Sequence, residues 1–481
     1  MGDFDDEDDD RYDDGDRERG QRPPAPVRRG DHVTLDVEAF ADGPDMLARI
    51  DSYVVLLPGA LPGERVRAAI QSGARKFGRA RVLHVDRASP DRVEPRCRHF
   101  LDCGGCHWQH VGYAAQLRQK QARVEKDLRF ALGDDAPPVE ACVPAPEPYG
   151  QRHKVALHLV PGGRSALLPA LHRARDVDLV ALRECPAVAP KAFALGCRAI
   201  ELLGELRLPP FDPFTGHGLL RSVLVRHAAA TGQSHLLVVA SGEVPELRHL
   251  LQPFLDAGAT TVSLNLNDGP PGRLLGHTTH LLTGPRRIDE ILDGTTYCIS
   301  PDAFFQTSPH GARELVRAVT AWLDPGPRDV VADLYCGGGL FALPLAARAG
   351  TVIGVEDSGV SIADAEAGQK RNRRRNARFV RGAADRVLLR FGNELPRPDL
   401  AVLDPPRAGA GPAVLERLCA LRPRRIAYVA CEPSALARDL LTLRGLGYAA
   451  RSVLPVDMFP QTWHVEAVAR LEPIAGADPA P

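Results

Sequence analysis

Residues 329–357 constrain the fold of this chain more than any other segment. Residues 329–335 form an apolar run typical of a buried strand, and a glycine-rich turn, Cys336-Gly337-Gly338-Gly339, follows it directly. A helix is expected from near Leu340, and a second apolar run, residues 351–355, ends on Glu356. A strand, a tight turn, a helix and a second strand are the elements of a parallel α/β sheet. The pattern predicts a Rossmann-like domain.

The same segment carries the elements of a nucleoside-binding site. Glycines let the backbone approach a ligand closely, and an acidic residue that ends the second strand, here Glu356, can accept both hydroxyls of a ribose. A dinucleotide site would have a third spaced glycine, whereas Leu340, Phe341 and Ala342 follow the turn here. The sequence therefore favours S-adenosylmethionine over NAD.

Two later strand ends carry an acid and a thiol. Residues 400–404 end on Asp404, which begins Asp-Pro-Pro-Arg, and residues 425–431 end on Cys431; a further acid, Glu466, follows. In open α/β sheets, substrates and cofactors bind at the carboxyl ends of strands. One region thus offers a nucleophile and a base, although a cysteine after a strand can also be a small core residue.

Taken together, these motifs resemble the RNA uridine-5-methyltransferases, which make 5-methyluridine in ribosomal and transfer RNA. The resemblance extends over nearly the whole chain after residue 28. Its recognisable segments are residues 304–306, 333–339, 404–407, 428–433, 437–439 and 459–466. The chain departs from the family pattern at Ser308 and Glu432, where the family usually has Asn, and at Leu340, where a polar residue is usual.

The resemblance implies a role for each candidate residue. Cys431 is the expected nucleophile, and Glu466 the expected base. The expected contacts to S-adenosylmethionine are Gln306, Tyr335, Gly337, Gly339, Leu340, Glu356 and Asp404. Carbon 5 of uracil is too poor a nucleophile to attack a sulfonium methyl group directly, and addition of a thiolate at carbon 6 makes it enolate-like. A base must then remove the hydrogen from carbon 5 before the cysteine leaves.

A separate group of cysteines indicates a metal centre. Cys97, Cys103 and Cys106 are spaced by six and three residues, and Cys185, which precedes a proline, is the best candidate for a fourth ligand. Structural zinc is the rival, but zinc sites usually use two short cysteine pairs, and free thiols are a third possibility. Family members with a similar spacing carry a [4Fe–4S] cluster, so the resemblance also favours iron and sulfur.

The predicted fold is multidomain, with α/β and β parts. Residues 29–93 alternate apolar and polar positions and resemble the TRAM domain, an OB-like RNA-binding β-barrel. Residues 94–295 are expected to form an α+β central domain that carries the cluster and recognises RNA, with residues 109–140 packing on the catalytic domain. Residues 296–475 are expected to form the class I methyltransferase domain. Residues 1–28 and 476–481 are expected to be tails, the first of them acidic and disordered.

Charge and composition bound the partners and the compartment. Residues 1–20 hold eleven acidic residues and three arginines, which leaves 50 acids and 57 bases in the remainder. A body of about +7 suits an RNA partner. The sequence has no apolar stretch long enough for a membrane span, and ten scattered cysteines do not form a disulfide scaffold. We expect a cytoplasmic monomer.

The sequence thus predicts an iron–sulfur RNA uridine-5-methyltransferase. Ribosomal RNA is the expected target, because tRNA-type relatives often lack the cluster cysteines. The alternatives are a tRNA uridine-5-methyltransferase, an amino or ribose methyltransferase, and an RNA-binding protein with a vestigial cofactor site.

Overall fold

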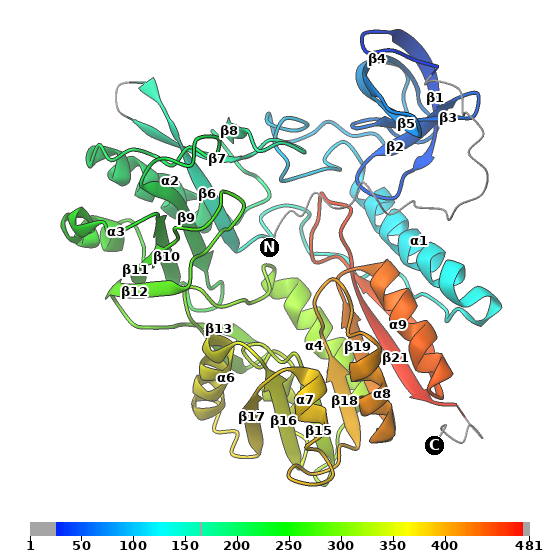
Figure 1. Ribbon diagram of the computed structural model, residues 1–481, viewed down its shortest axis with the longest axis vertical. Helices are drawn as coiled ribbons and strands as arrows, with labels where there is room; N and C mark the ends of the chain where they lie inside the picture. The colour runs from blue at the N-terminus through cyan, green and yellow to red at the C-terminus, as the bar shows by residue number, and fades with distance from the viewer. Residues whose placement is uncertain (1–25, 164–165, 475–481) are drawn as a thin grey trace.

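The computed structural model describes residues 26–163 and 166–474. Figure 1 shows three parts along the chain: a barrel in blue, a central sheet in green, and a sheet in yellow to red that ends the chain. The tails predicted for residues 1–28 and 476–481 lie outside the described residues, apart from residues 26–28. Within the described ranges, no helix combines the length and the apolar character that a membrane crossing requires.

The first part is a closed five-stranded barrel in the order β1-β2-β3-β5-β4, which confirms the predicted OB-like fold. Inward positions alternate with outward positions along β4, where Val66 and Ala68 are fully buried. Trp108 and Val111, which follow the barrel in the chain, complete its core. The strands are β1 His32–Phe40, β2 Met46–Ile50, β3 Tyr53–Leu57, β4 Arg65–Gly73 and β5 Phe77–Arg87.

The central part is a seven-stranded sheet in the order β12-β11-β10-β9-β6-β7-β8. Its neighbouring strands are antiparallel except for the parallel pair β10 and β11, and helix α2 (Pro190–Glu205) covers one face. The predicted α+β architecture is confirmed. The strands are β6 Lys154–Pro161, β7 Leu167–His172, β8 Leu179–Ala181, β9 Leu220–His227, β10 Ser234–Ala240, β11 Thr261–Leu266 and β12 Thr278–Thr283.

The last part is a seven-stranded sheet in the order β17-β16-β15-β18-β19-β21-β20. The first five strands are parallel, and the terminal hairpin of β20 and β21 is added antiparallel to β19. Two apolar clusters cover its two faces, as expected of a Rossmann-like sheet. The strands are β15 Val330–Leu334, β16 Thr351–Glu356, β17 Ala377–Arg381, β18 Leu400–Leu403, β19 Arg425–Ala430, β20 Tyr448–Val456 and β21 Glu466–Pro473.

The helix expected from near Leu340 begins two residues later and is short. Helix α5 spans only Ala342–Leu345. Pro344 has no N–H to donate to the carbonyl of Leu340, and that carbonyl instead accepts a hydrogen bond of 3.0 Å from the Tyr297 hydroxyl. The other elements of this part are the hairpin β13 Ile288–Leu292 and β14 Thr295–Ile299, and the helices α4 Pro309–Leu323, α6 Gly359–Arg371, α7 Ala384–Leu388, α8 Pro412–Ala420 and α9 Pro433–Gly445.

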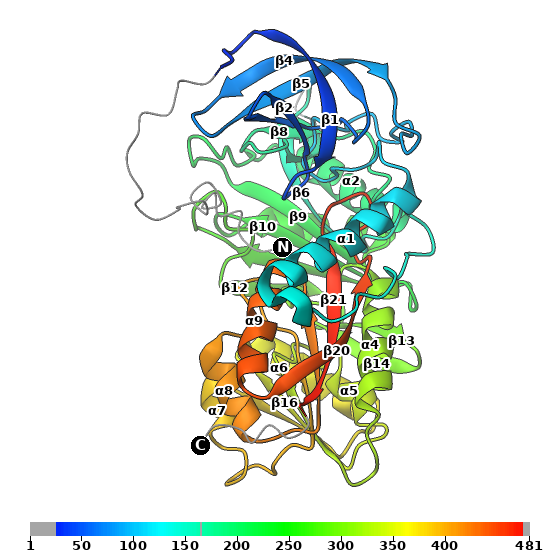
Figure 2. The same ribbon diagram turned by 90° about the vertical axis from the view of Figure 1, so that its right-hand side faces the viewer.

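Helix α1 (Tyr113–Leu132) connects the barrel to the last sheet. It packs against α9, and its Val124 and Leu128 belong to the apolar cluster on that side of the sheet. Figure 2 shows α1 in cyan between the barrel and the elements β20, β21 and α9. The buried ammonium group of Lys120 pairs with the buried carboxylate of Asp457, which ties α1 to the end of β20. The two parts are therefore joined by a packed helix.

Candidate functional site

The site predicted from the sequence lies at the carboxyl edge of the parallel strands. Asp404 follows β18, and Cys431 follows β19. Strand β21 runs antiparallel to β19, with Ala467 opposite Ala430, so its first residue, Glu466, starts where β19 ends. Strand register therefore places the Glu466 carboxyl beside the Cys431 thiol.

The turn after β15 has the backbone that a close ligand approach requires. Tyr335, Gly337 and Gly339 have φ angles of 63°, 51° and 85°. Both carboxylate oxygens of Glu356 accept backbone hydrogen bonds, 3.1 Å from the Gly337 N–H and 2.9 Å from the Ser358 N–H. Glu356 thus fixes the glycine turn to the end of β16.

Leu340 differs from the other predicted cofactor contacts. Its side chain is buried in the apolar cluster between α4 and the sheet, with 7% of its surface exposed. The Leu340 side chain can therefore offer a ligand only a nonpolar contact. The nonpolar side chain at this position serves the core.

Gln306, a predicted cofactor contact, is anchored by the central sheet. Arg226 of β9 is buried, and its guanidinium donates to the carbonyl of Phe305 at 3.0 Å and to that of Gln306 at 3.4 Å. Burial lowers the pKa of Arg226 to about 10, so the group remains charged at neutral pH. This anchor between two domains is not visible in the local sequence.

Several buried carboxyl groups gather at this edge. Asp333 is fully buried, and its two carboxylate oxygens have no hydrogen bond of normal geometry from the described residues. Burial raises the pKa of Asp333 well above its ordinary value, and burial raises that of Asp404 to about 7, although Asp404 stays partly accessible. Such groups suit a cationic ligand, because a positive charge would stabilise their ionised forms.

The Cys431 thiol and the Glu466 carboxyl share this environment. Burial and the neighbouring Glu466 raise the pKa of Cys431 to about 12, while Arg407 opposes the shift. Burial and then Asp404 raise the pKa of Glu466 to about 8, again opposed by Arg407. A carboxyl group with a pKa near 8 is suited to proton transfer at physiological pH. Arg407 was noted in the sequence only as part of the Asp-Pro-Pro-Arg motif.

Hydrogen bonds fix the loops that carry these groups. The Tyr428 hydroxyl donates to the Asp439 carboxylate, which also accepts a 2.7 Å hydrogen bond from the Ala410 N–H. The loop that starts at Asp404 is thereby held to α9, the helix that follows Cys431. Tyr428 and Asp439 therefore have a structural role, which is to fix the loop that starts at Asp404.

The loop before Glu466 is held from outside the sheet. Gln461 has a positive φ of 68°, and its backbone carbonyl accepts hydrogen bonds of 2.9 and 3.0 Å from the N–H groups of His107 and Trp108. Gln116 of α1 donates to and accepts from Gln461, at 3.0 Å in each case. The segment immediately after Cys106 therefore supports the loop that leads to Glu466.

The four cysteines of the predicted metal centre lie in one region. The ionisation of Cys97, Cys103 and Cys185 is influenced by the Cys106 thiol, and burial is the main cause that raises the pKa of all three, to about 11 for Cys185. Arg152 donates to the Cys106 sulfur at 3.7 Å.

The Gly105 N–H adds a second donor to this region, 3.4 Å from the sulfur of Cys103. Across the described residues, no three His, Cys, Asp or Glu side chains are close enough to hold a single metal ion. The donor set is all sulfur, with N–H groups directed at two of the sulfurs. Such an arrangement fits an iron–sulfur cluster, whose sulfur ligands commonly accept hydrogen bonds.

Known families match two segments of the chain. Residues 293–473 match the family described as tRNA (Uracil-5-)-methyltransferase, and residues 26–83 match the TRAM domain. The first match covers the seven-stranded sheet that carries the candidate site, including its terminal hairpin of β20 and β21. The second covers most of the barrel.

Similar proteins extend over almost the whole chain. An uncharacterized RNA methyltransferase of Gloeobacter violaceus is 34% identical over 455 residues, which cover 93% of this chain and 98% of the relative. One of Halalkalibacterium halodurans is 33% identical, with 93% and 98% covered. The crystal structure of Pyrococcus abyssi tRNA (uracil-54, C5)-methyltransferase in complex with S-adenosyl-L-homocysteine has a TM-score of 0.72 and 26% identity, with 91% of this chain and 99% of that chain covered.

Proposed function

Since this chain belongs to the family of S-adenosylmethionine-dependent RNA uracil-5-methyltransferases, we propose that Cys431 and Glu466 carry the reaction and that the target uridine lies in ribosomal RNA. The observation that carries the mechanism is the position of a thiol and a carboxyl with a pKa of about 8 at adjacent ends of β19 and β21. The other candidate residues of the site are proposed to support the Cys431 thiol and the Glu466 carboxyl.

Each group has a defined chemical task. The Cys431 thiol gives up its proton to solvent, and the thiolate adds to carbon 6 of uracil, so that the electron pair of the 5,6 double bond makes carbon 5 nucleophilic. S-adenosylmethionine supplies the methyl group. Glu466 then takes the remaining hydrogen of carbon 5 as a proton, the double bond re-forms, and the thiolate leaves carbon 6. Arg407 favours the negative charge on the sulfur and on the carboxylate.

The cofactor would be held by the acidic edge and the glycine turn. Gln306, Tyr335 and Asp404 are proposed side-chain contacts, and Glu356 is proposed to accept the ribose hydroxyls. Gly337 and Gly339 would allow close backbone approach, and Leu340 would add a backbone or nonpolar contact. The fully buried carboxyl of Asp333 adds to the acidic groups that would favour a cationic ligand here.

We also propose that Cys97, Cys103, Cys106 and Cys185 hold a [4Fe–4S] cluster. The all-sulfur donor set and the N–H groups of Arg152 and Gly105 support this assignment. The group would fix the segment that ends at Cys106. His107 follows at once and supports Gln461, so the proposed role of the cluster is to position the loop before Glu466.

Ribosomal RNA is proposed as the target because the cluster cysteines are those that tRNA-type relatives often lack. The alternative is tRNA, and the similarity to the P. abyssi tRNA (uracil-54, C5)-methyltransferase favours it. Mapping of 5-methyluridine in ribosomal and transfer RNA from a strain without this protein separates the two. Loss of a ribosomal 5-methyluridine supports the proposal, and loss confined to tRNA contradicts it.

The mechanism is tested by replacing Glu466 with Gln. Because Glu466 acts after methyl transfer, Glu466→Gln should accumulate a methylated covalent adduct between protein and RNA that survives denaturing gels. Glu472→Gln, a change of the same kind on the same strand, is the matched control and should release product normally. Normal turnover by Glu466→Gln would remove this residue from the mechanism.

A further inference from the structure

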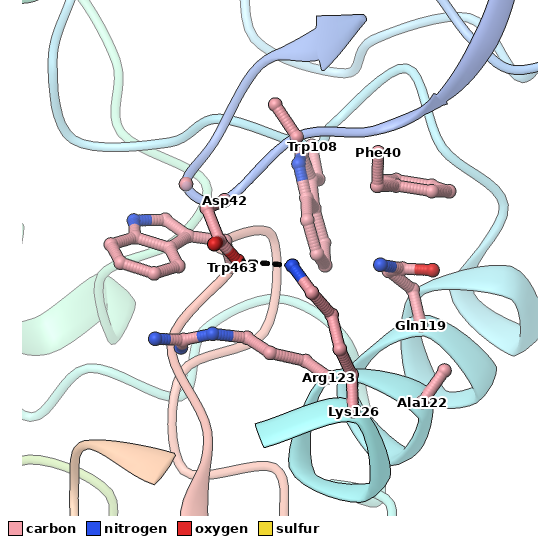
Figure 3. Close-up of a pocket in the computed structure, with 10 residues that line it drawn as sticks. Phe40, Asp42, Trp108, Gln119, Ala122, Arg123, Lys126 and Trp463 are labelled. Atoms are coloured by element: carbon pink, nitrogen blue, oxygen red, sulfur yellow. Dashed lines mark hydrogen bonds and ion pairs between the residues drawn. The ribbon is translucent and has the colours of Figure 1, made fainter. Parts of the chain in front are cut away.

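A pocket of about 260 Å³ lies between the barrel, helix α1 and the loop that leads to Glu466. Four parts of the chain line it: the end of β1 and the turn after it with Phe40 and Asp42, the segment before α1 with Trp108, helix α1 with Arg123 and Lys126, and the loop before Glu466 with Trp463. Figure 3 shows these side chains around one hollow, with Trp108 behind them. Pockets for drug-sized ligands measure about 300–1,000 Å³, so this one suits a smaller planar group.

Aromatic rings and cations form the walls of this pocket. The guanidinium carbon of Arg123 lies 4.1 Å from the centroid of the Trp463 ring, and Trp463 is only partly buried. Phe40 contacts the buried ring of Trp108 with a centroid separation of 5.2 Å. Aromatic faces combined with basic side chains are typical of sites that bind unpaired nucleotides through base stacking and phosphate contacts.

The mouth of the pocket carries an exchangeable cation. Lys126 pairs with Asp42 at 2.8 Å, and both side chains are more than half exposed. Exposed ion pairs contribute roughly 0–1 kcal/mol, so a phosphate group can replace the carboxylate as the partner of Lys126 at little cost. The pocket thus offers a stacking surface and a phosphate contact together.

The walls also contact both proposed catalytic segments. Trp463 stands three residues before Glu466 in the chain. Arg123, which packs on Trp463, forms an ion pair with Glu432, the residue immediately after Cys431. A base in this pocket would therefore belong to a nucleotide close to the uridine at Cys431.

We propose that this pocket, the Trp463 pocket, binds the base of an RNA nucleotide next to the methylated uridine, with the phosphate of that nucleotide at Lys126. The inference rests on the proposed function. A uridine in a stack must be turned out before its carbon 6 can reach a thiol, and its neighbour then loses a stacking partner. Stacking on Trp463 would replace that loss and hold the strand in the orientation that presents the uridine.

Steady-state kinetics with unmethylated RNA from a strain lacking this protein tests the pocket. Base–aromatic stacking contributes about 1–3 kcal/mol, so Trp463→Leu should raise the KM for RNA by about 5-fold to 150-fold. Trp463→Phe keeps an aromatic face and should stay within about threefold of the wild type. Trp322→Phe, at the end of α4, is the matched control and should leave KM unchanged. A Trp463→Leu enzyme whose KM stays within twofold, or whose kcat falls alone, would overturn the proposal.

A binding measurement keeps the proposal testable without turnover. The probe is a single-stranded oligonucleotide of the sequence around the methylated uridine, with an abasic site on one or the other side of it. One abasic position should weaken binding to the wild type by about fivefold or more, and the same change should have little further effect on Trp463→Leu. Equal losses in both proteins, or no loss at either position, would contradict the pocket. Absence of methyl transfer by the wild type would instead refute the proposed function itself.

Discussion

The Cys431 thiol and the thiols of Cys97, Cys103, Cys106 and Cys185 are held in contrasting ways. Cys431 stands at the end of a buried parallel strand, and burial together with the neighbouring carboxyl groups raises its pKa. The other four lie in loops, where Arg152 and a backbone N–H donate to two of the sulfurs. The first environment is fixed by strand register, whereas the second depends on few contacts of its own. The comparison indicates that the Cys431 site is preformed by the sheet, whereas the loop thiols have less support from their own surroundings.

The largest effect on activity is expected from removing the Cys431 thiol. Cys431→Ala should lower kcat by about 10⁴-fold or more, because no other group can add to carbon 6 of uracil. The affinity for S-adenosylmethionine should change by no more than a few fold, since the thiol acts on uracil. Cys419→Ala, which removes a buried thiol from α8, is the control and should retain activity. Near-normal turnover by Cys431→Ala would show that Cys431 is not the nucleophile and so does not differ in role from the loop thiols.

The loop thiols should show a different dependence. Protein purified without oxygen should contain about four irons per chain, and Cys185→Ser should lose them together with the brown colour. Cys142→Ser and Cys197→Ser, which alter thiols outside the group, should retain the iron. Iron analysis and visible absorption measure both outcomes. Stoichiometric zinc without iron in the anaerobic wild type would contradict the cluster.

The pH dependence of turnover tests the environment of Cys431 and Glu466. Glu466 must be ionised to accept a proton, and its pKa is about 8, so kcat should rise up to about pH 8 and then level off. Asp404, with a pKa of about 7, faces the same groups and should add to the lower part of the rise. A profile that is flat from pH 6 to 9 would exclude Glu466 as the base. A rise that continues beyond pH 10 would instead assign control of the rate to ionisation of the Cys431 thiol.

The smallest effect is expected next to Cys431. Glu432 pairs with Arg123 and raises the pKa of both Cys431 and Glu466. Glu432→Gln should therefore shift the rise of kcat to lower pH and reduce the plateau value of kcat by about threefold to tenfold, because Arg123 loses its anionic partner. Glu394→Gln, in the exposed pair with Arg390, is the control. An unchanged pH profile would show that Glu432 does not influence the catalytic groups.

Local patterns in the sequence predicted the strand ends, and the fold class is confirmed. The strands that end at Leu334, Glu356, Leu403 and Ala430 follow from short apolar runs with turn residues after them. Local patterns could not predict contacts between distant segments. Gln116 meets Gln461 across 345 positions, and Arg226 meets the Gln306 carbonyl across 80. These contacts depend on how the domains pack.

Local patterns were equally unable to predict the contacts within the candidate site. Asp333 and Arg407 stood within motifs in the sequence, but nothing in their neighbours' identities indicated an unpartnered buried carboxylate or a cation facing Cys431. The pairing of Arg123 with Glu432 also joins two domains, so the unusual acid after Cys431 had no visible partner in the sequence. Charge partners of this kind require the tertiary structure.

The central claim is that Cys431 forms a covalent bond to carbon 6 of the target uracil. RNA in which 5-fluorouridine replaces uridine tests it directly, because fluorine occupies the position of the hydrogen that Glu466 must remove as a proton. Methyl transfer can proceed, but elimination of the thiol cannot. Mass spectrometry of the digested complex should locate a methylated 5-fluorouracil on the peptide that contains Cys431. Complete release of the RNA under denaturing conditions, or an adduct on another residue, would contradict the account.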